Sequence, residues 1–376
     1  MKILVAADSF KDSLDSLRVC EAICRGLKQA NANFEISIFP LADGGEGTSD
    51  ILAYHLGGKK AKIKVCDPLF RTIEADYLIS GDNKTAFIEM AKASGLQLLS
   101  TSERNPLLTS TFGVGQMIQD AIEKGVEKIT LAIGGSATNE GGIGMATALG
   151  IELYDGHNTK LRGTGEDLGH LAKISFNENT RKKLSKISFS VICDVTNQLS
   201  GPTGASFIYG AQKGADDNMI KILDAGLIKL AKLTKADDLA NLPGAGAAGG
   251  LGFGAMTFLG AKLFRGIDMI MQMTDFEKHI QGVDVIITGE GRIDDQTSEG
   301  KLIHGVASMG LKYHIPVIAL CGSLGLNSKI IKDLGLTAAF SITPHPVDLD
   351  IALRDTEINL ETTSYNVGKL LNLLHN

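Results

Sequence analysis

The chain has 376 residues, of which 44% are hydrophobic, and its 37 Lys and Arg residues against 43 Asp and Glu residues leave a formal net charge of -6. This length exceeds what one hydrophobic core holds, so we expect two domains, and the acidic balance argues against a nucleic-acid-binding surface. No apolar run reaches the roughly 18–20 residues that cross a bilayer, and the five scattered cysteines contain no C-x-x-C pair, so neither a membrane span, a disulfide framework nor a zinc site is indicated.

The opening of the chain predicts a βαβα unit. Residues 2–7 form a continuous apolar run typical of a buried parallel strand, and apolar residues from Leu14 to Leu27 recur at helical spacing. A second strand is expected at 35–39 and a second helix at 48–56. Because charged residues follow the first strand almost at once, we read the start as a mature strand rather than a signal peptide and expect a cytoplasmic protein.

A β-hairpin is expected to interrupt this rhythm. The alternating segments 73–79 and 84–90 flank a turn-rich break at 80–83. Antiparallel pairing at this point indicates the entry to a second domain of different topology.

The βα alternation returns in the last third of the chain. The middle is expected to contain strands at 128–133 and 187–193 and a helix at 215–235, and the last third strands at 284–288, 316–321 and 338–342 with helices near 303–313, 328–334 and 357–374. We therefore predict an α/β protein in which residues 1–70 and 283–376 form one parallel-sheet domain, with a second α/β domain, 71–282, inserted into it.

Six polar or glycine-rich blocks follow strand-like runs or lie close to one. Ligand sites in parallel sheets form outside the carboxyl ends of the strands, so we expect these blocks to meet at one site in a cleft between the domains. The blocks are 7–13, 41–48, 134–142, 193–197, 243–252 and 288–296.

The block 134–142, GGSATNEGG, has the ingredients of an anion cradle. Glycine frees backbone N–H groups, Ser136 and Thr138 supply hydroxyls, and a helix is expected to follow. A tight turn with a helix cap is the alternative.

The block 243–252 contains G-x-G-x-x-G at Gly244, Gly246 and Gly249, but the residues before it are not a strand, so the dinucleotide-binding interpretation fails its context. A helix start or a nucleotide-facing loop is preferred. A P-loop is also absent, because no Gly-Lys pair is followed by Ser or Thr. Kinase chemistry in this chain would therefore need an architecture other than the Walker cradle.

Acidic and basic residues recur in these blocks. Phosphoryl transfer needs carboxylates for magnesium, one carboxylate to accept the hydroxyl proton, and cations on the transferring phosphate. For each carboxylate alone, a solvated loop charge or a helix cap is the alternative. The candidate acids are Asp8, Asp43, Glu46, Asp194, Glu290 and Asp294, and the candidate cations are Lys11, Lys213, Arg292 and Lys301.

Eight blocks in this order resemble the bacterial glycerate kinase family that is distinct from P-loop and ribokinase-like kinases. They are ADSFKDSL, ADGGEGT, FIEMAKASGL, IGGSATNEGGIGM, CDVTN, QKGA, PGAGAAGGLG and ITGEGRIDDQT, and the match runs to about residue 320. The resemblance implies ATP- and Mg²⁺-dependent phosphorylation of D-glycerate, at the 2-hydroxyl to give 2-phosphoglycerate. It also implies a flavodoxin-like domain formed by both chain ends.

Four positions depart from the family pattern. Gln198, Ala211 and Ile303 stand where proline is expected, and Glu140 stands where Asp is commoner. These changes affect loop rigidity more than charge, so the implied reaction stands.

Roles are assigned to individual residues as hypotheses. Asp194, or failing that Asp294, accepts the proton of the glycerate hydroxyl. Arg292 and Lys301 offset charge on the γ-phosphate, while Asp43 and Glu46 hold magnesium. The substrate- and phosphate-binding set is Asp8, Ser9, Lys11, Gly135, Ser136, Thr138, Asn139, Thr196, Asn197, Lys213, Gly246 and Glu290.

Other functions remain open at this point. One is phosphorylation at the 3-hydroxyl or of a related small hydroxy acid, and another is a non-catalytic anion or metabolite sensor. The carboxylates argue against the sensor, because a pure anion binder gains nothing from acids directed at its ligand. The expected partners are glycerate and ATP, with no nucleic acid or membrane, and a homo-oligomeric state is left open.

Overall fold

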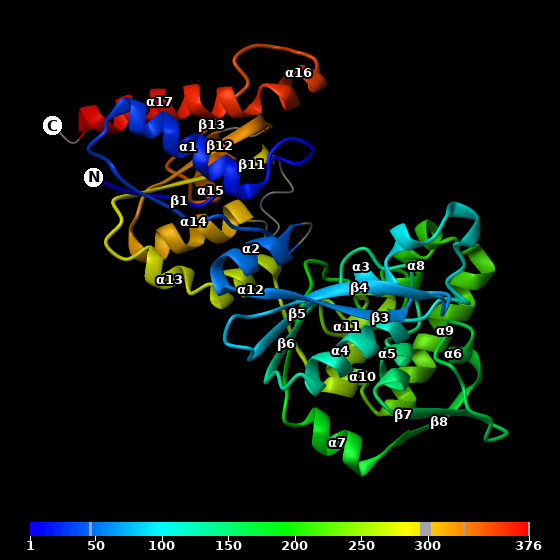
Figure 1. Cartoon of the computed structure of the whole chain (residues 1–376). Coiled ribbons are helices and arrows are strands. Elements are labelled where there is room, and N and C mark those ends of the chain that lie inside the picture. The colour runs from blue at the N-terminus through cyan, green and yellow to red at the C-terminus, as the bar shows by residue number, and fades with distance from the viewer. Residues whose placement is uncertain (45–46, 294–301, 326–327, 375–376) are drawn as a thin grey trace. The chain divides into compact units, whose positions relative to one another are not determined.

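The structure is a computed structural model that describes residues 1–44, 47–293, 302–325 and 328–374. The chain divides into two compact units. The first unit comprises Met1–His55 and Arg265–Asn376, and the second comprises Leu56–Phe264. In Figure 1 the blue start of the chain and its orange and red end build the first unit together. The domain ranges expected from the sequence, 1–70 with 283–376 and 71–282, stay a prediction.

The first unit contains a parallel sheet with the flavodoxin-like strand order. Every neighbouring pair of strands in it is parallel, and the spatial order is β13-β12-β11-β1-β2. In chain order this is 2-1-3-4-5, whose direction of winding changes between β1 and β11, and ligands bind at such switch points. The strands are β1 Lys2–Val5, β2 Glu35–Ile38, β11 Val285–Ile293, β12 Val317–Leu324 and β13 Ala338–Ser341. The predicted fold class is confirmed here.

Two long helices, α1 and α17, pack against one another in the first unit. Helix α1, Ser16–Ala30, begins at Asp15, whose side chain accepts a hydrogen bond from the Arg18 N–H at 2.9 Å. At Gly26 of α1 a Cβ atom would lie 2.2 Å from the Glu361 carbonyl of α17, Thr356–Leu374, so glycine permits the close packing. The unit's other helices are α2 Thr48–Leu56, whose last residue falls in the second unit, α12 Gly266–Met273, α13 Phe276–His279, α14 Leu302–Tyr313, α15 Ser328–Asp333 and α16 Leu349–Arg354.

The second unit contains a mixed sheet of order β10-β9-β6-β5-β4-β3. The predicted hairpin is confirmed, because β4 and β5 pair antiparallel, with Ile79 opposite Ala86. From β5 to β10 all pairs are parallel. The sequence analysis did not expect β3, whose alternating lysines weaken its apolar signal. The strands are β3 Lys59–Cys66, β4 Thr72–Ile79, β5 Thr85–Glu89, β6 Lys128–Ala132, β9 Ser188–Ile192 and β10 Lys262–Phe264.

The remaining elements of the second unit surround this sheet and a smaller antiparallel pair, β7 Ile151–Asp155 and β8 Leu171–Phe176. The α-helices are α3 Ala91–Ser94, α4 Phe112–Glu123, α5 Ile143–Ala148, α6 Asp167–His170, α7 Glu178–Leu184, α8 Ala205–Tyr209, α9 Asp217–Thr234, α10 Asp237–Ala240 and α11 Ala247–Leu259. Short 3₁₀ helices lie at Leu96–Leu98 (η1), Thr101–Glu103 (η2) and Ala211–Lys213 (η3). None of the helices in the described part of the chain combines the length and apolar character that crossing a bilayer requires.

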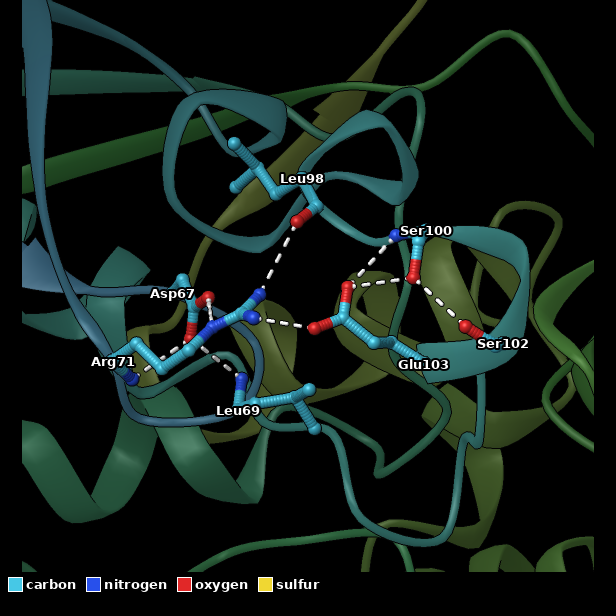
Figure 2. A network of polar contacts seen from close by, with 7 residues as sticks. All are labelled: Asp67, Leu69, Arg71, Leu98, Ser100, Ser102 and Glu103. Atoms are coloured by element: carbon cyan, nitrogen blue, oxygen red, sulfur yellow. Dashed lines mark hydrogen bonds and ion pairs between the residues drawn. The ribbon is translucent and has the colours of Figure 1, made fainter.

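A polar network ties the turn before β4 to η1 and η2. Figure 2 shows the Arg71 guanidinium between the carboxylates of Asp67 and Glu103, at 2.5 Å from each. The same guanidinium donates to the Leu98 carbonyl at 3.3 Å. Because Asp67 is buried, these contacts and the bond that its carboxylate accepts from the Leu69 N–H satisfy a charge that would otherwise be costly.

Candidate functional site

Acidic residues gather at the carboxyl edge of the first unit's sheet. Asp8 follows β1, Asp43 follows β2, and Glu290 lies in β11. The Asp8 N–H donates to the Gly289 carbonyl at 2.9 Å, and its carboxylate accepts from the Ser9 N–H at 2.6 Å. A Cβ at Gly289 would lie 2.5 Å from the Leu320 carbonyl, so glycine is needed where β11 and β12 pair beside Asp8. Asp8 therefore lies at the switch point of this sheet.

The electrostatics of this edge favour a proton or a cation. Burial, together with the nearby charges of Asp43 and Glu290, raises the pKa of Asp8 to about 7, and the hydrogen bonds from Ser9 oppose this change. Burial, with a contribution from Glu290, also raises the pKa of the Cys321 thiol to about 12. Asp8 and Glu290, expected from the sequence to bind substrate or phosphate, stay predictions in that role, and the acidic setting would also suit a metal ion or a transferred proton.

The acids fit a magnesium ion held by few protein ligands. Among the described residues, no three His, Cys, Asp or Glu side chains are grouped to hold a metal ion. Magnesium is commonly held by one or two carboxylates together with water and substrate phosphates, so a closed protein cage is not required. A divalent cation would relieve the repulsion that Asp43 and Glu290 exert on the Asp8 carboxylate.

The other candidate residues of the first unit differ in their exposure to solvent. Lys11 is exposed just beyond Asp8, and Ser9 is partly buried. Arg292 is exposed in β11, in register with Ser323 of β12. Glu46, Asp294 and Lys301 lie outside the described residues.

A buried lysine marks the carboxyl edge of the second unit's sheet. Lys213, in η3, is only 2% exposed, and its ammonium donates to the Ser136 hydroxyl at 2.8 Å and to the Thr138 carbonyl at 2.7 Å. Both acceptors belong to the loop that follows β6. Burial lowers the pKa of Lys213 to about 7, and the charge of Glu140 opposes that change.

Buried hydrogen bonds also fix the loop 134–142. The Asn139 amide donates to the Ser206 hydroxyl of α8 at 2.9 Å, and the Thr109 hydroxyl donates to the Ala137 carbonyl at 3.0 Å. The Glu140 carboxylate accepts from the N–H of Thr111 at 2.7 Å and from its hydroxyl. The side chains of Thr138 and Asn139 are fully buried, so the loop reaches solvent through Gly134 and Gly135 instead.

The glycine-rich block 243–252 supports these loops. It enters α11, as the interpretation of a helix start expected, and Ala248, Gly249 and Gly250 have left-handed backbone conformations. At Gly249 a Cβ would lie 2.0 Å from the Thr138 carbonyl, and at Gly246 one would lie 2.1 Å from the Gln198 carbonyl. Gly246 also donates its N–H to the Asn197 carbonyl at 2.9 Å. These glycines let the backbone pass close to both loops.

The loop after β9 presents its polar residues unequally. Asp194 and Thr196 are exposed, whereas the Asn197 side chain bonds with the Thr203 carbonyl at 2.8 Å and with the Tyr209 hydroxyl at 2.7 Å. Asn197 therefore orders its own loop. Asp194 and Thr196 are exposed to solvent at this edge, and their role in binding stays a prediction.

Sequence reasoning missed two residues that shape this edge. Glu140 was noted only as a departure from the family pattern, and Thr111 was not noted. Their signal was a charged residue between glycines and a Thr-Ser-Thr run before an apolar helix, and neither pattern reveals burial.

Comparisons with known proteins agree over the whole chain. The model of the glycerate kinase family matches residues 3–372. The chain is 44% identical to a glycerate kinase of Bacillus cereus, over 98% of this chain and 97% of that protein. It is 41% identical to the glycerate 2-kinase of Escherichia coli, over 99% and 98%. A crystal structure assigned as glycerate kinase 2 from Salmonella typhimurium LT2 superposes with a TM-score of 0.89 at 41% identity, covering 100% of this chain and 99% of that one.

Proposed function

Since this chain belongs to the glycerate kinase family, we propose that it transfers a phosphoryl group from ATP to the 2-hydroxyl of D-glycerate, giving 2-phosphoglycerate and ADP. The observation that carries the proposal is the near full-length similarity to a protein named glycerate 2-kinase. The chain is therefore an enzyme of the kinase class, and ATP and glycerate are its proposed substrates.

The chemistry of the two sheet edges supports phosphoryl transfer. This reaction is catalysed chiefly by positioning and by offsetting charge on the transferring group. Asp43 and Glu46 are proposed to hold Mg²⁺, with Asp8 near enough to Asp43 to respond to its charge. When bound, the ion would offset negative charge on the phosphate groups. Arg292 and Lys301 are proposed to face the γ-phosphate.

The proton acceptor is proposed to be Asp194. It is exposed at the end of a parallel strand and is therefore within reach of a substrate. Asp294 is the second candidate. Glycerate also needs donors for its carboxylate, and Ser136 with the backbone N–H of Gly135 is our proposal for these, with Lys213 supporting Ser136. The rest of the predicted binding set is Ser9, Lys11, Thr138, Asn139, Thr196, Asn197 and Gly246.

Product analysis tests the proposal. Purified protein with ATP and Mg²⁺ should release ADP with D-glycerate and none with L-glycerate, and ³¹P NMR should identify 2-phosphoglycerate. A 3-phosphoglycerate product would move the reaction to the other hydroxyl, and turnover only with another short hydroxy acid would change the substrate. Binding of D-glycerate without ADP release under any condition would contradict the kinase and favour an anion sensor. A cytoplasmic location and the oligomeric state stay predictions.

A further inference from the structure

The bond between Lys213 and Ser136 constrains where the serine proton points. A protonated ammonium group has donors and no lone pair, so the Ser136 oxygen accepts in this bond, at 2.8 Å. The serine O–H must then donate elsewhere. Ser136 is 7% exposed and Lys213 is 2% exposed, so both are buried. The lysine therefore fixes the acceptor side of the hydroxyl and leaves its proton to be donated to another group.

Glu140 is the buried acid of the same loop. One of its carboxylate oxygens accepts the N–H of Thr111 at 2.7 Å and the Thr111 hydroxyl, and that hydroxyl in turn accepts the Met145 N–H at 2.8 Å. The other oxygen is buried and meets no hydrogen-bond partner at standard geometry among the described residues. Burial raises the pKa of Glu140, and the Thr111 hydroxyl with the N–H groups of Thr111, Gly142 and Gly144 opposes this change. The charged form of so buried a carboxylate is costly unless a positive charge also compensates.

Lys213 is a buried cation at the same edge. Among the described groups, Glu140 is the one whose charge acts on Lys213, and it favours the protonated form. Two other charged residues lie close along the packed segments: Arg104, whose carbonyl would be 2.2 Å from a Cβ at Gly214, and Asp216, which caps α9. The Asp216 carboxylate is engaged by the Asn218 and Met219 N–H groups. Glu140 and Lys213 are therefore the coupled pair.

We propose that Glu140 and Lys213 are positioning residues that together keep the Ser136 hydroxyl turned as a hydrogen-bond donor toward an anionic oxygen of the bound substrate. The identity of that substrate rests on the proposed function. A neutral Lys213 amine would carry a lone pair and could accept the serine proton, which would turn the donor away from the ligand. Glu140 prevents this by stabilising the ammonium form, and Thr111 fixes the carboxylate in place.

The kinetic test follows the Michaelis constants for D-glycerate and ATP between pH 6 and 9 in the wild type, Glu140→Gln and Ser136→Ala. In the wild type, the constant for the ligand that Ser136 contacts should rise as pH increases through about 7. Glu140→Gln should move that rise to lower pH, and Ser136→Ala should weaken binding and remove the rise. A change in the constant for glycerate identifies a carboxylate contact, and a change in that for ATP a phosphate contact. An unshifted profile in Glu140→Gln would overturn the proposal.

A second measurement does not depend on the reaction. The pKa of Lys213 is lower in the folded than in the unfolded chain, so the folded state gains stability from this group as pH rises from about 7 toward 10.5. Without substrate, the pH dependence of Tm should show this gain beginning at lower pH in Glu140→Gln. In a Lys213→Met background, Glu140→Gln should cause no such shift. If it does, Glu140 and Lys213 are not coupled and the proposal fails, whether or not the protein phosphorylates glycerate.

Thr111→Val separates positioning from charge. This variant removes the hydroxyl bond to Glu140 and keeps the carboxylate. It should lower Tm while leaving the pH at which the Tm gain begins unchanged. Coupling in the Tm series together with a flat pH profile for both Michaelis constants would remove Ser136 from the proposal.

Discussion

The two parallel sheet edges differ in charge although they occupy the same topological position. At the edge of the first unit, the charges of Asp43 and Glu290 act against the Asp8 carboxylate, whereas at the edge of the second, the buried Lys213 donates to a hydroxyl and a carbonyl oxygen. The first edge therefore suits a cation or a proton, and the second suits an anionic group of a ligand. A phosphoryl transfer needs both environments, because a metal ion and an anionic substrate must be bound in the same reaction.

Asp194 is the exception to this division, and its substitution is expected to have the largest effect. It is an exposed acid at the edge of the second unit. If it accepts the hydroxyl proton, Asp194→Asn should lower kcat by about 10²–10⁴-fold, measured as ADP release at saturating D-glycerate. Asp238→Asn, an exposed acid on α10, is the control and should leave kcat unchanged. Near wild-type turnover in Asp194→Asn would mean that another acid accepts the hydroxyl proton. The catalytic acids could then all belong to the first edge.

At the second edge, a substitution that disturbs backbone packing should cost more stability than one that changes a charge. Gly249 has a φ of +66°, and a Cβ there would meet the Thr138 carbonyl at 2.0 Å. Gly249→Ala should therefore lower the free energy of unfolding by about 2–4 kcal/mol, from the left-handed backbone and the overpacking together. Denaturant titration measures it. Gly134→Ala in the supported loop is the matched control, because a Cβ there meets nothing within 4 Å. Equal losses in both variants would show that steric contact under the loop is not the cause.

At the first edge, the ionised Asp8 carboxylate should lower the stability of the folded chain. The Asp8 carboxyl has a pKa of about 7 in the fold against 3.8 for the free group, so the folded chain binds more protons and loses stability as pH rises from about 4 to 7. Asp8→Asn should abolish this loss and raise Tm at pH 8 by roughly 2–4 °C. The exposed acid Asp350 serves as the control, since Asp350→Asn should keep the wild-type pH dependence. If the Tm of Asp8→Asn falls with pH as much as that of the wild type, a group other than Asp8 causes the loss of stability.

The sequence predicted most elements of the first unit because its strands are apolar runs and its helices are amphipathic. Helix α2 has the bounds expected, and the hairpin of β4 and β5 was found from its turn. Strand β3 was missed because six of its eight residues are lysine, cysteine or alanine on a partly exposed surface, which leaves little apolar alternation. Pairing with β4 over its whole length, rather than its own pattern, makes it a strand.

The site was predicted as a set of blocks, and burial decided what the blocks do. Gly249 and Gly246 matched a dinucleotide fingerprint by spacing, yet they serve close backbone packing under neighbouring loops. Thr138 was expected to offer its hydroxyl, and the structure buries that group and uses the carbonyl instead. Residue type and spacing indicate which loops carry polar groups. Only the packing of other segments decides which atoms stay accessible.

The smallest effect on stability and activity is expected for a substitution in the ion-pair network of Arg71, which lies outside both sheet edges. The Arg71 side chain is 47% exposed and contacts Asp67, Glu103 and the Leu98 carbonyl. Arg71→Lys keeps one positive charge but cannot reproduce a planar guanidinium that reaches three acceptors. Because a lysine keeps a positive charge beside the buried Asp67 and the Arg71 side chain is itself half exposed to solvent, Tm should fall by no more than about 2 °C and kcat should not change. A larger fall, or a loss of turnover, would mean that this network acts on the loop after β6 through η1, whose Leu96 donates its N–H to the Gly135 carbonyl at 2.8 Å. The contrast between the two edges would then extend to the elements that support them.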